Sequence, residues 1–157
     1  MYSDPVDLVV AFLNTLDVEE QTVLLDNPSQ WREWIATTLA VDPAAAPDPD
    51  RDSARALRTH LRAVVSGDAG PSSPRIPVSV DLDPTGAYLT SDTVVGTLAA
   101  AVAQLAIEKR WDRVKICPAD DCRWAFYDAS RNHSRQWCSM RVCGNRAKVR
   151  NHRARAD

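Results

Sequence analysis

The segments CPADDC, residues 117–122, and CSMRVC, residues 138–143, contain all four cysteines of this 157-residue chain. The cysteines form the pattern C-x4-C-x15-C-x4-C, in which two close pairs are separated by a loop. Thiolates paired in this way suit one tetrahedral Zn²⁺, with Cys117, Cys122, Cys138 and Cys143 as its ligands. Two disulfides or an iron–sulfur cluster would use the same residues, and both stay open as alternatives.

A zinc ion held by four thiolates has no open position for water or substrate, so we expect a structural site. Residues 111–157 are too few to bury a stable core without such support. We expect the stretch between the cysteine pairs to form a hairpin, in which WAFYD (124–128) and RQW (135–137) flank a polar turn. Its aromatic residues would form a small core: Trp124, Phe126, Tyr127 and Trp137.

The two parts of the chain differ in charge. Residues 1–110 carry 8 Lys and Arg against 16 Asp and Glu, whereas residues 111–157 carry 11 against 5. Such asymmetry indicates an interaction segment for an anionic partner. The stretch GNRAKVRNHRARA, residues 144–156, reads as a basic helix whose cations can neutralise phosphates or read guanine edges in double-stranded DNA. The predicted nucleic-acid contacts are Arg131, Asn132, Arg135, Arg141, Asn145, Arg146, Lys148, Arg150, His152 and Arg153.

Other readings of the basic segment stay open. The helix could be solvated, docked on the acidic part of this chain, or bound to an acidic protein partner. In an RNA-binding protein, exposed Trp124, Phe126 or Trp137 would stack on unpaired bases.

Residues 1–110 predict a helical domain. Apolar side chains recur at helical spacing after Asp4-Pro5, after Ser29, which is expected as a helix cap, and between residues 52 and 65. On the third of these helices, Arg55, Arg58 and Arg62 are expected on the outer face.

Three further segments complete this part of the chain. Residues 75–91 alternate around DPTG and predict a β-hairpin. Asp92 is expected to cap a last apolar helix that runs to about Arg110, and the Pro-rich segment 41–50 reads as a loop. We therefore predict a mainly α fold with a small β-hairpin: a helical domain over 1–110, then a treble-clef-like or ribbon-like zinc finger over 111–157.

The sequence shows no nucleophile–base pair and no open metal site, so we expect no enzyme. The start of the chain lacks a secretory signal, and we expect a cytoplasmic protein. The longest uncharged apolar run, residues 93–107, is too short to span a bilayer. Trp31 and Trp34 read as core residues, and the expected roles of the helical domain are binding of a small-molecule effector or dimerisation.

The stretch FYDASRNHSRQWCSMRVCGNRAKVRNHRAR, residues 126–155, resembles the CGNR zinc-finger family, which is named for residues 143–146. At residue 133 the family usually has a small residue, often Gly, where this chain has His. The segments DLVVAFLNTLD (7–17) and W..WI (31–35) resemble the ABATE domain that usually precedes this finger. The resemblance implies one structural zinc ion, a DNA-binding finger, ligand sensing by the helical domain, and a role as a bacterial stress-responsive transcription regulator.

Overall fold

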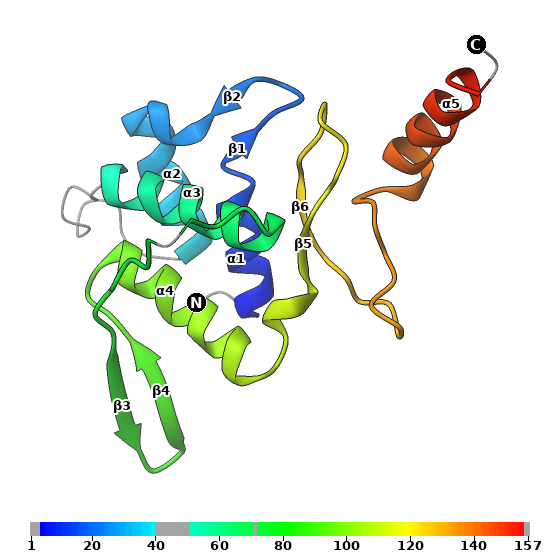
Figure 1. The fold of residues 1–157 in the computed structure, drawn as a ribbon. Coiled ribbons are helices and arrows are strands. Elements are labelled where there is room, and N and C mark those ends of the chain that lie inside the picture. The colour runs from blue at the N-terminus through cyan, green and yellow to red at the C-terminus, as the bar shows by residue number, and fades with distance from the viewer. Residues whose placement is uncertain (1–3, 40–50, 71, 156–157) are drawn as a thin grey trace.

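The computed structural model of the chain describes residues 4–39, 51–70 and 72–155. The described chain is mainly helical, as predicted, with short antiparallel strand pairs (Figure 1). The loop expected at 41–50 lies outside the described residues. In chain order the elements are α1 (Pro5–Leu13), β1 (Leu16–Asp17), β2 (Thr22–Val23), the 3₁₀ turn η1 (Leu24–Asp26), α2 (Pro28–Leu39), α3 (Arg51–Ser66), β3 (Ser79–Asp83), β4 (Gly86–Thr90), α4 (Val94–Ile107), the 3₁₀ turn η2 (Trp111–Arg113), β5 (Val114–Ile116), β6 (Ala125–Tyr127), the π-helical turn η3 (Met140–Gly144) and α5 (Asn145–Arg153).

Side-chain caps fix where the helices begin. The Asp4 carboxylate accepts a hydrogen bond from the Val6 N–H at 2.9 Å, which confirms the predicted start of α1. Two other predicted caps are wrong by one or two positions. Asn27, not Ser29, accepts from the first N–H groups of α2, and Thr93, not Asp92, accepts from the Gly96 N–H at 3.0 Å. A capping side chain accepts from an N–H group two or three residues ahead. Asn27 and Thr93 have such a group within reach.

The larger core lies between α1, α2, α3 and α4. Trp31 and Phe12 are its largest fully buried side chains, and their rings lie 6.5 Å apart. Val114 of β5 and Ala125 of β6 belong to the same core, although they come from the cysteine-containing end of the chain. No helix in the described ranges has the length and apolarity needed to cross a membrane.

Two arginines of α3 are buried, which the sequence did not predict. Arg58 and Arg62 are 4% and 9% exposed, whereas the outward position predicted for Arg55 is confirmed. The Arg62 guanidinium donates to the Leu13 carbonyl at 2.8 Å and to the Arg123 carbonyl at 2.7 Å. The hydrophobic pattern placed both buried arginines on a polar face because it takes no account of backbone carbonyls at the ends of neighbouring elements.

The β5–β6 hairpin is fastened to α1 as well. The Asn14 side-chain amide donates to the Ala125 carbonyl at 2.9 Å, and its oxygen accepts from the Ala125 N–H at 2.7 Å. This paired contact satisfies the outer edge of β6, just as a neighbouring strand would. Asn14 and Arg62 therefore hold the hairpin that leads into the cysteine cluster against the helical domain.

The β3–β4 hairpin is confirmed, and it forms an isolated two-stranded ribbon. Its register pairs Asp83 with Gly86 across the predicted turn and Ser79 with Thr90 at the base. In Figure 1 the ribbon extends away from the helices, and its tip lies far from α5.

Replacing Arg62 with methionine is expected to lower the free energy of unfolding by about 2–4 kcal/mol, because one buried and one half-buried carbonyl lose a charged donor. Arg55→Met is the matched control on the same helix. Its guanidinium is partly exposed and pairs with Asp26, so we expect a loss of at most about 1 kcal/mol. Urea unfolding followed by circular dichroism measures both values. Equal losses in the two variants would contradict the role given to Arg62.

Candidate metal centre and basic helix

The first cysteine pair lies in the connection between β5 and β6. The Cys117 N–H donates to the Trp124 carbonyl at 2.8 Å, and the Cys122 N–H donates to the Ala119 carbonyl at 3.0 Å. Arg123, which follows, has a left-handed backbone with a φ of 54°. These features fold the CPADDC segment back on itself and bring both sulfurs to one end of the hairpin.

The second pair lies where the chain enters α5. Cys138 is half-buried just before η3, and Cys143 is buried within it. A Cβ atom at Gly144 would lie 2.6 Å from the Met140 sulfur. Glycine at this position therefore leaves room for the Met140 side chain within η3.

The four sulfurs converge on a space that fits one ion. All the Sγ atoms lie within 4.8 Å of one another. The Cys138 sulfur lies 3.5 Å from that of Cys122 and 3.6 Å from that of Cys143. Tetrahedral Zn–S bonds of about 2.3 Å place the sulfurs about 3.8 Å apart, whereas a disulfide requires about 2.05 Å. An iron–sulfur cluster has several atoms between its cysteines and spreads them farther apart.

The donor set is therefore that of one structural Zn²⁺. Burial raises the pKa of Cys143 to about 11, and it also raises the pKa of Cys138 together with the hydrogen bond to the Cys122 thiol. Burial opposes ionisation of Cys117 as well, but hydrogen bonds from the N–H groups of Cys138 and Ala119 lower its pKa overall. Zinc supplies the positive charge that allows all four thiols to ionise.

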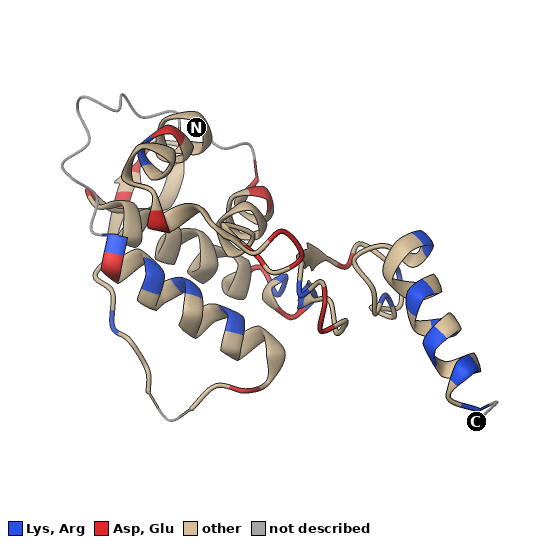
Figure 2. Ribbon diagram, turned by 90° about the horizontal axis from the view of Figure 1, so that it is seen from above, with Lys and Arg blue, Asp and Glu red and all other residues tan. Residues whose placement is uncertain are grey.

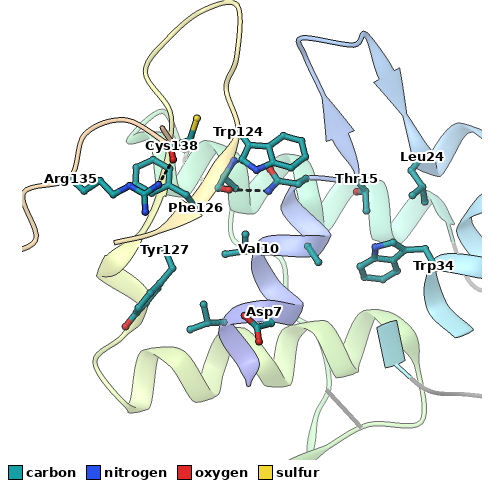
Figure 3. Close-up of a pocket in the computed structure, with 14 residues that line it drawn as sticks. Asp7, Val10, Thr15, Leu24, Trp34, Trp124, Phe126, Tyr127, Arg135 and Cys138 are labelled. Carbon is teal, nitrogen blue, oxygen red and sulfur yellow. Dashed lines mark hydrogen bonds between the residues drawn. The ribbon is translucent and has the colours of Figure 1, made fainter. Parts of the chain in front are cut away.

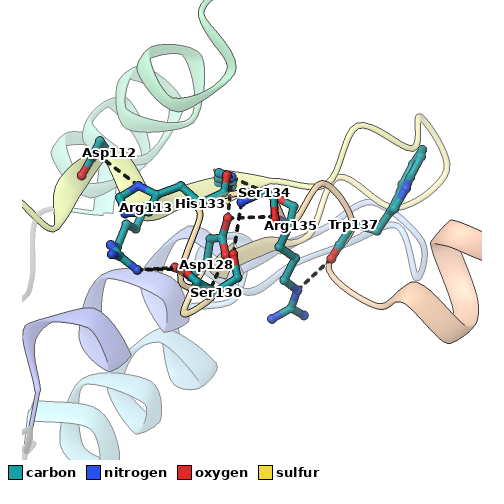
Figure 4. Close-up of polar contacts among 9 residues, drawn as sticks. Asp112, Arg113, Asp128, Ser130, His133, Ser134, Arg135 and Trp137 are labelled. Carbon is teal, nitrogen blue, oxygen red and sulfur yellow. Dashed lines mark hydrogen bonds and ion pairs between the residues drawn. The ribbon is translucent and has the colours of Figure 1, made fainter.

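The buried carboxylate of Asp128 organises the loop between the cysteine pairs (Figure 4). The Lys115 ammonium donates to it at 2.6 Å, and the N–H groups of Ser130 and Arg135 donate at 2.9 and 3.0 Å. Burial opposes ionisation, but the hydrogen bonds from Lys115 and Ser130 hold the pKa of Asp128 well below its usual range. Sequence reasoning gave Asp128 no role of its own. The available signal was the D-x-S spacing, which is typical of a turn closed by an aspartate side chain.

The hairpin predicted between the cysteine pairs is wrong in its pairing. Strand β6 pairs with β5, with Val114 opposite Tyr127, and residues 135–137 form no strand. The short connection between Cys117 and Cys122 places β5 beside β6, and Asn14 occupies the other edge of β6. No edge of β6 is therefore left for residues 135–137.

The three residues of this loop that were predicted to contact nucleic acid differ in their surroundings. Arg131 and Asn132 are exposed at its tip, where the following His133 has a φ of 51°, in the left-handed region that glycine adopts most easily. Arg135 instead packs onto other residues of the finger. Its guanidinium is 4.8 Å from the Phe126 ring centre and donates to main-chain carbonyls of Trp137 and Cys138.

Helix α5 projects away from the rest of the molecule and carries cations along its length (Figure 2). None of its residues is buried, and Arg146 alone among its cations is half-buried. The helix thus brings together most of the predicted contacts at this end of the chain: Asn145, Arg146, Lys148, Arg150, His152 and Arg153. Arg141 is exposed in η3, and its carbonyl accepts from the Asn145 side chain at 3.0 Å.

One side of α5 faces carboxylates of the same chain. The Arg146 guanidinium lies 2.8 Å from the carboxylate of Glu19, which is in the β1–β2 turn. It lies 3.6 Å from the carboxylate of Asp121. Arg150 lies 3.5 Å from Asp121. At about 100° per residue, Lys148 and His152 lie on the opposite side of the helix. Sequence reasoning missed Glu19 and Asp121 because scattered surface acids give no signal of their partners.

A groove of about 700 Å³ crosses the outer side of α1 between the helical domain and the finger (Figure 3). Trp34 lines it, while Trp31 is fully buried. On the finger side, Trp124 is 38% exposed, whereas Phe126 is buried and Trp137 is half-buried. Of the three aromatic side chains considered for stacking on RNA bases, Trp124 is therefore the most accessible.

Removing zinc with a chelator is expected to abolish the near-ultraviolet circular dichroism of Trp124 and Trp137. Returning zinc is expected to release protons, because an ordinary thiol is protonated at neutral pH and the cysteines bind zinc as thiolates. Zinc affinity should therefore increase with pH. Calorimetric titration in buffers of different ionisation enthalpy measures the proton count.

Cys143→Ser is the control for this experiment, and it should bind zinc more weakly and release fewer protons. Near-ultraviolet circular dichroism that does not change when the metal is completely removed would contradict a structural role for zinc, whereas the stacked pair Trp31 and Trp34 of the helical domain is expected to keep its signal.

Two family profiles match the chain. The profile described as "CGNR zinc finger" matches residues 113–156 and includes all four cysteines. The ABATE profile, described as "Putative stress-induced transcription regulator", matches residues 6–125, which is more than half of the chain. No curated protein matches the sequence. The chain therefore belongs to the ABATE family and ends in a CGNR zinc finger.

Proposed function

We propose that this protein is a DNA-binding transcription regulator in which zinc folds the finger and α5 contacts the phosphates of double-stranded DNA. The observation that carries the proposal is the projection of α5, a helix with no buried residue and a cation in every turn. Within the described residues, Lys148 and Arg153 form no ion pair, so their charges are available to a partner. Phosphates are the partner that such a row of cations attracts most strongly.

The structure around α5 supports the same conclusion. The zinc site anchors the start of the helix, since Cys143 lies within η3, directly before α5. A hairpin that provides two ligands and a helix that follows the other two form a treble-clef-like arrangement, which we assign to this finger. Arg131 and Asn132 at the exposed loop tip provide a second group of phosphate contacts. Four thiolates close the metal site to substrate, so the proposed role is not enzymatic.

The helical domain is proposed to control access to α5. The Glu19 carboxylate forms an ion pair with the Arg146 guanidinium, and the Asp121 carboxylate lies close to both Arg146 and Arg150. A phosphate backbone must compete with these carboxylates. The groove over α1 is the site that we assign to a small-molecule effector, because residues of both parts line it. A thermal-shift screen tests this assignment, with Ala11→Trp as the variant whose groove is filled.

An acidic protein is the second candidate partner. The ion pairs of α5 within this chain favour it, because they show that carboxylates fit the same arginines. Single-stranded RNA is the third candidate, with Trp124 as the most accessible stacking side chain.

Selection from sheared genomic DNA of the organism that encodes the chain, at roughly 150 mM salt, tests the main proposal. We expect enrichment of a few promoter-proximal sites by zinc-loaded protein and none by Cys143→Ser. On a selected site, Lys148→Gln and Arg153→Gln should each reduce the salt slope of log K by about 0.9, because each variant neutralises one phosphate fewer. Arg75→Gln, which removes an exposed charge from the helical domain, is the control. Uniform weak recovery across the genome would reject a sequence-specific regulator.

Glu19→Gln is expected to strengthen DNA binding by up to about fivefold, because an exposed ion pair contributes at most about 1 kcal/mol. The control is Glu20→Gln, which makes the same change in net charge one residue away. Among the described residues, Glu20 forms no ion pair. Fluorescence anisotropy with labelled duplex measures both affinities. Equal effects of the two variants would show that net charge, rather than the contact with Arg146, restrains the helix.

A further inference from the structure

The β3–β4 ribbon has one apolar face and one polar face. Residues directly opposite each other in an antiparallel pair lie on the same face, and the register pairs Val80 with Leu89 and Leu82 with Ala87. Val78 continues this face two residues before Val80. The other face carries the pairs Ser79 with Thr90 and Asp81 with Tyr88.

The apolar face is open to solvent. Leu82 is 79% exposed and Val80 is 59% exposed, which makes them two of the three most exposed large hydrophobic residues in the described chain. Val78 is 38% exposed, and Leu89 is half-buried near the base, where β4 contacts α4. Contiguous apolar side chains on a protein surface mark a site of interaction, whereas single ones need no explanation.

The ribbon is already folded for such an interaction. The Asp83 carboxylate accepts hydrogen bonds from the Thr85 N–H at 2.7 Å, the Thr85 hydroxyl at 2.6 Å and the Gly86 N–H at 3.1 Å. These bonds fix the turn and therefore the register of the two strands. A two-stranded ribbon is marginally stable by itself, so a partner on its apolar face would stabilise the ribbon as well.

Charge restricts what that partner can be. Residues 76–107 contain no Lys or Arg, and their charged residues are Asp81, Asp83 and Asp92. Nucleic acid and anionic membranes are therefore repelled from this part of the molecule. A basic partner would be drawn to the polar face, where Asp81 lies, and would leave the apolar face uncovered. A second ribbon of the same kind covers the apolar face and carries no large negative charge toward it. Two apolar faces can pack together while their aspartates point outward.

We propose that two copies of this chain form a homodimer in which the apolar faces of their ribbons pack together about a twofold axis. The interface consists of Val78, Val80, Leu82, Ala87 and Leu89 from each copy. A twofold contact of this type is closed and does not propagate into fibres. The five side chains cover less than the roughly 800 Å² per partner of a standard interface, so the dimer is reversible. In Figure 1 the ribbon tip and α5 lie at opposite ends of the molecule, so the contact leaves both basic helices accessible.

Sedimentation velocity of the zinc-loaded full chain, from about 1 to about 200 µM, tests the proposal. The unmodified chain should shift from monomer to dimer within this range. Val80→Glu and Leu82→Glu should each raise the dissociation constant by at least about tenfold, because each places a charge in the apolar contact. Ser79→Glu adds the same charge to the polar face of the same strand and should leave the dimer intact. Unchanged far-ultraviolet circular dichroism shows that the variants fold.

Three results would overturn the proposal. A chain that stays monomeric at the highest concentration has no such interface. A dimer that survives both Val80→Glu and Leu82→Glu uses another surface. If Ser79→Glu disrupts the dimer as strongly as Val80→Glu does, the contact does not discriminate between the two faces of the ribbon.

Discussion

Four thiols that lie within 4.8 Å of one another, three of them buried and one half-buried, cannot all ionise unless a cation lies among them. The finger depends on this constraint, because its own apolar side chains are too few to hold it together. Zinc joins the β5–β6 connection to the start of α5, and these two segments are separated by the long polar loop around Asp128. The direction in which α5 leaves the molecule is therefore set by the metal. The loop between the two cysteine pairs is held by a second centre, the Asp128 carboxylate with its donors Lys115, Ser130 and Arg135.

The helical domain and the finger are connected by contacts of different strength. Arg62 and Asn14 bind the main chain of the β5–β6 hairpin through half-buried hydrogen bonds. Glu19 reaches α5 through an exposed ion pair, which salt weakens. The hairpin is thus fixed to the helical domain, whereas the contact between Glu19 and the basic helix is easily exchanged for another anion. The regulator that we propose needs this combination, because its basic helix must be held in a defined position and still be released to a partner.

The sequence predicts those features that depend on local pattern or on a fixed number of ligands. Helical spacing located α1, α2 and α3, a long apolar run located α4, the DPTG turn located β3–β4, and the cysteine spacing identified the metal ligands. Features that depend on distant main-chain atoms were missed. Arg58 and Arg62 read as surface residues because their acceptors, such as the Thr15 hydroxyl and the Arg123 carbonyl, come together only in the folded chain. The partner of β6 was missed for a similar reason, since Asn14 occupies one edge of the strand from more than a hundred residues away.

The β5–β6 hairpin also determines how this protein can be divided. Val114 and Ala125 complete the core of the helical domain, while the connection between their strands carries Cys117 and Cys122. A recombination breakpoint before β5 would leave that core without two of its members. A breakpoint after β6 would separate the first pair of zinc ligands from the second. Neither part can be transplanted intact without the other, so the two are expected to be inherited as a single unit.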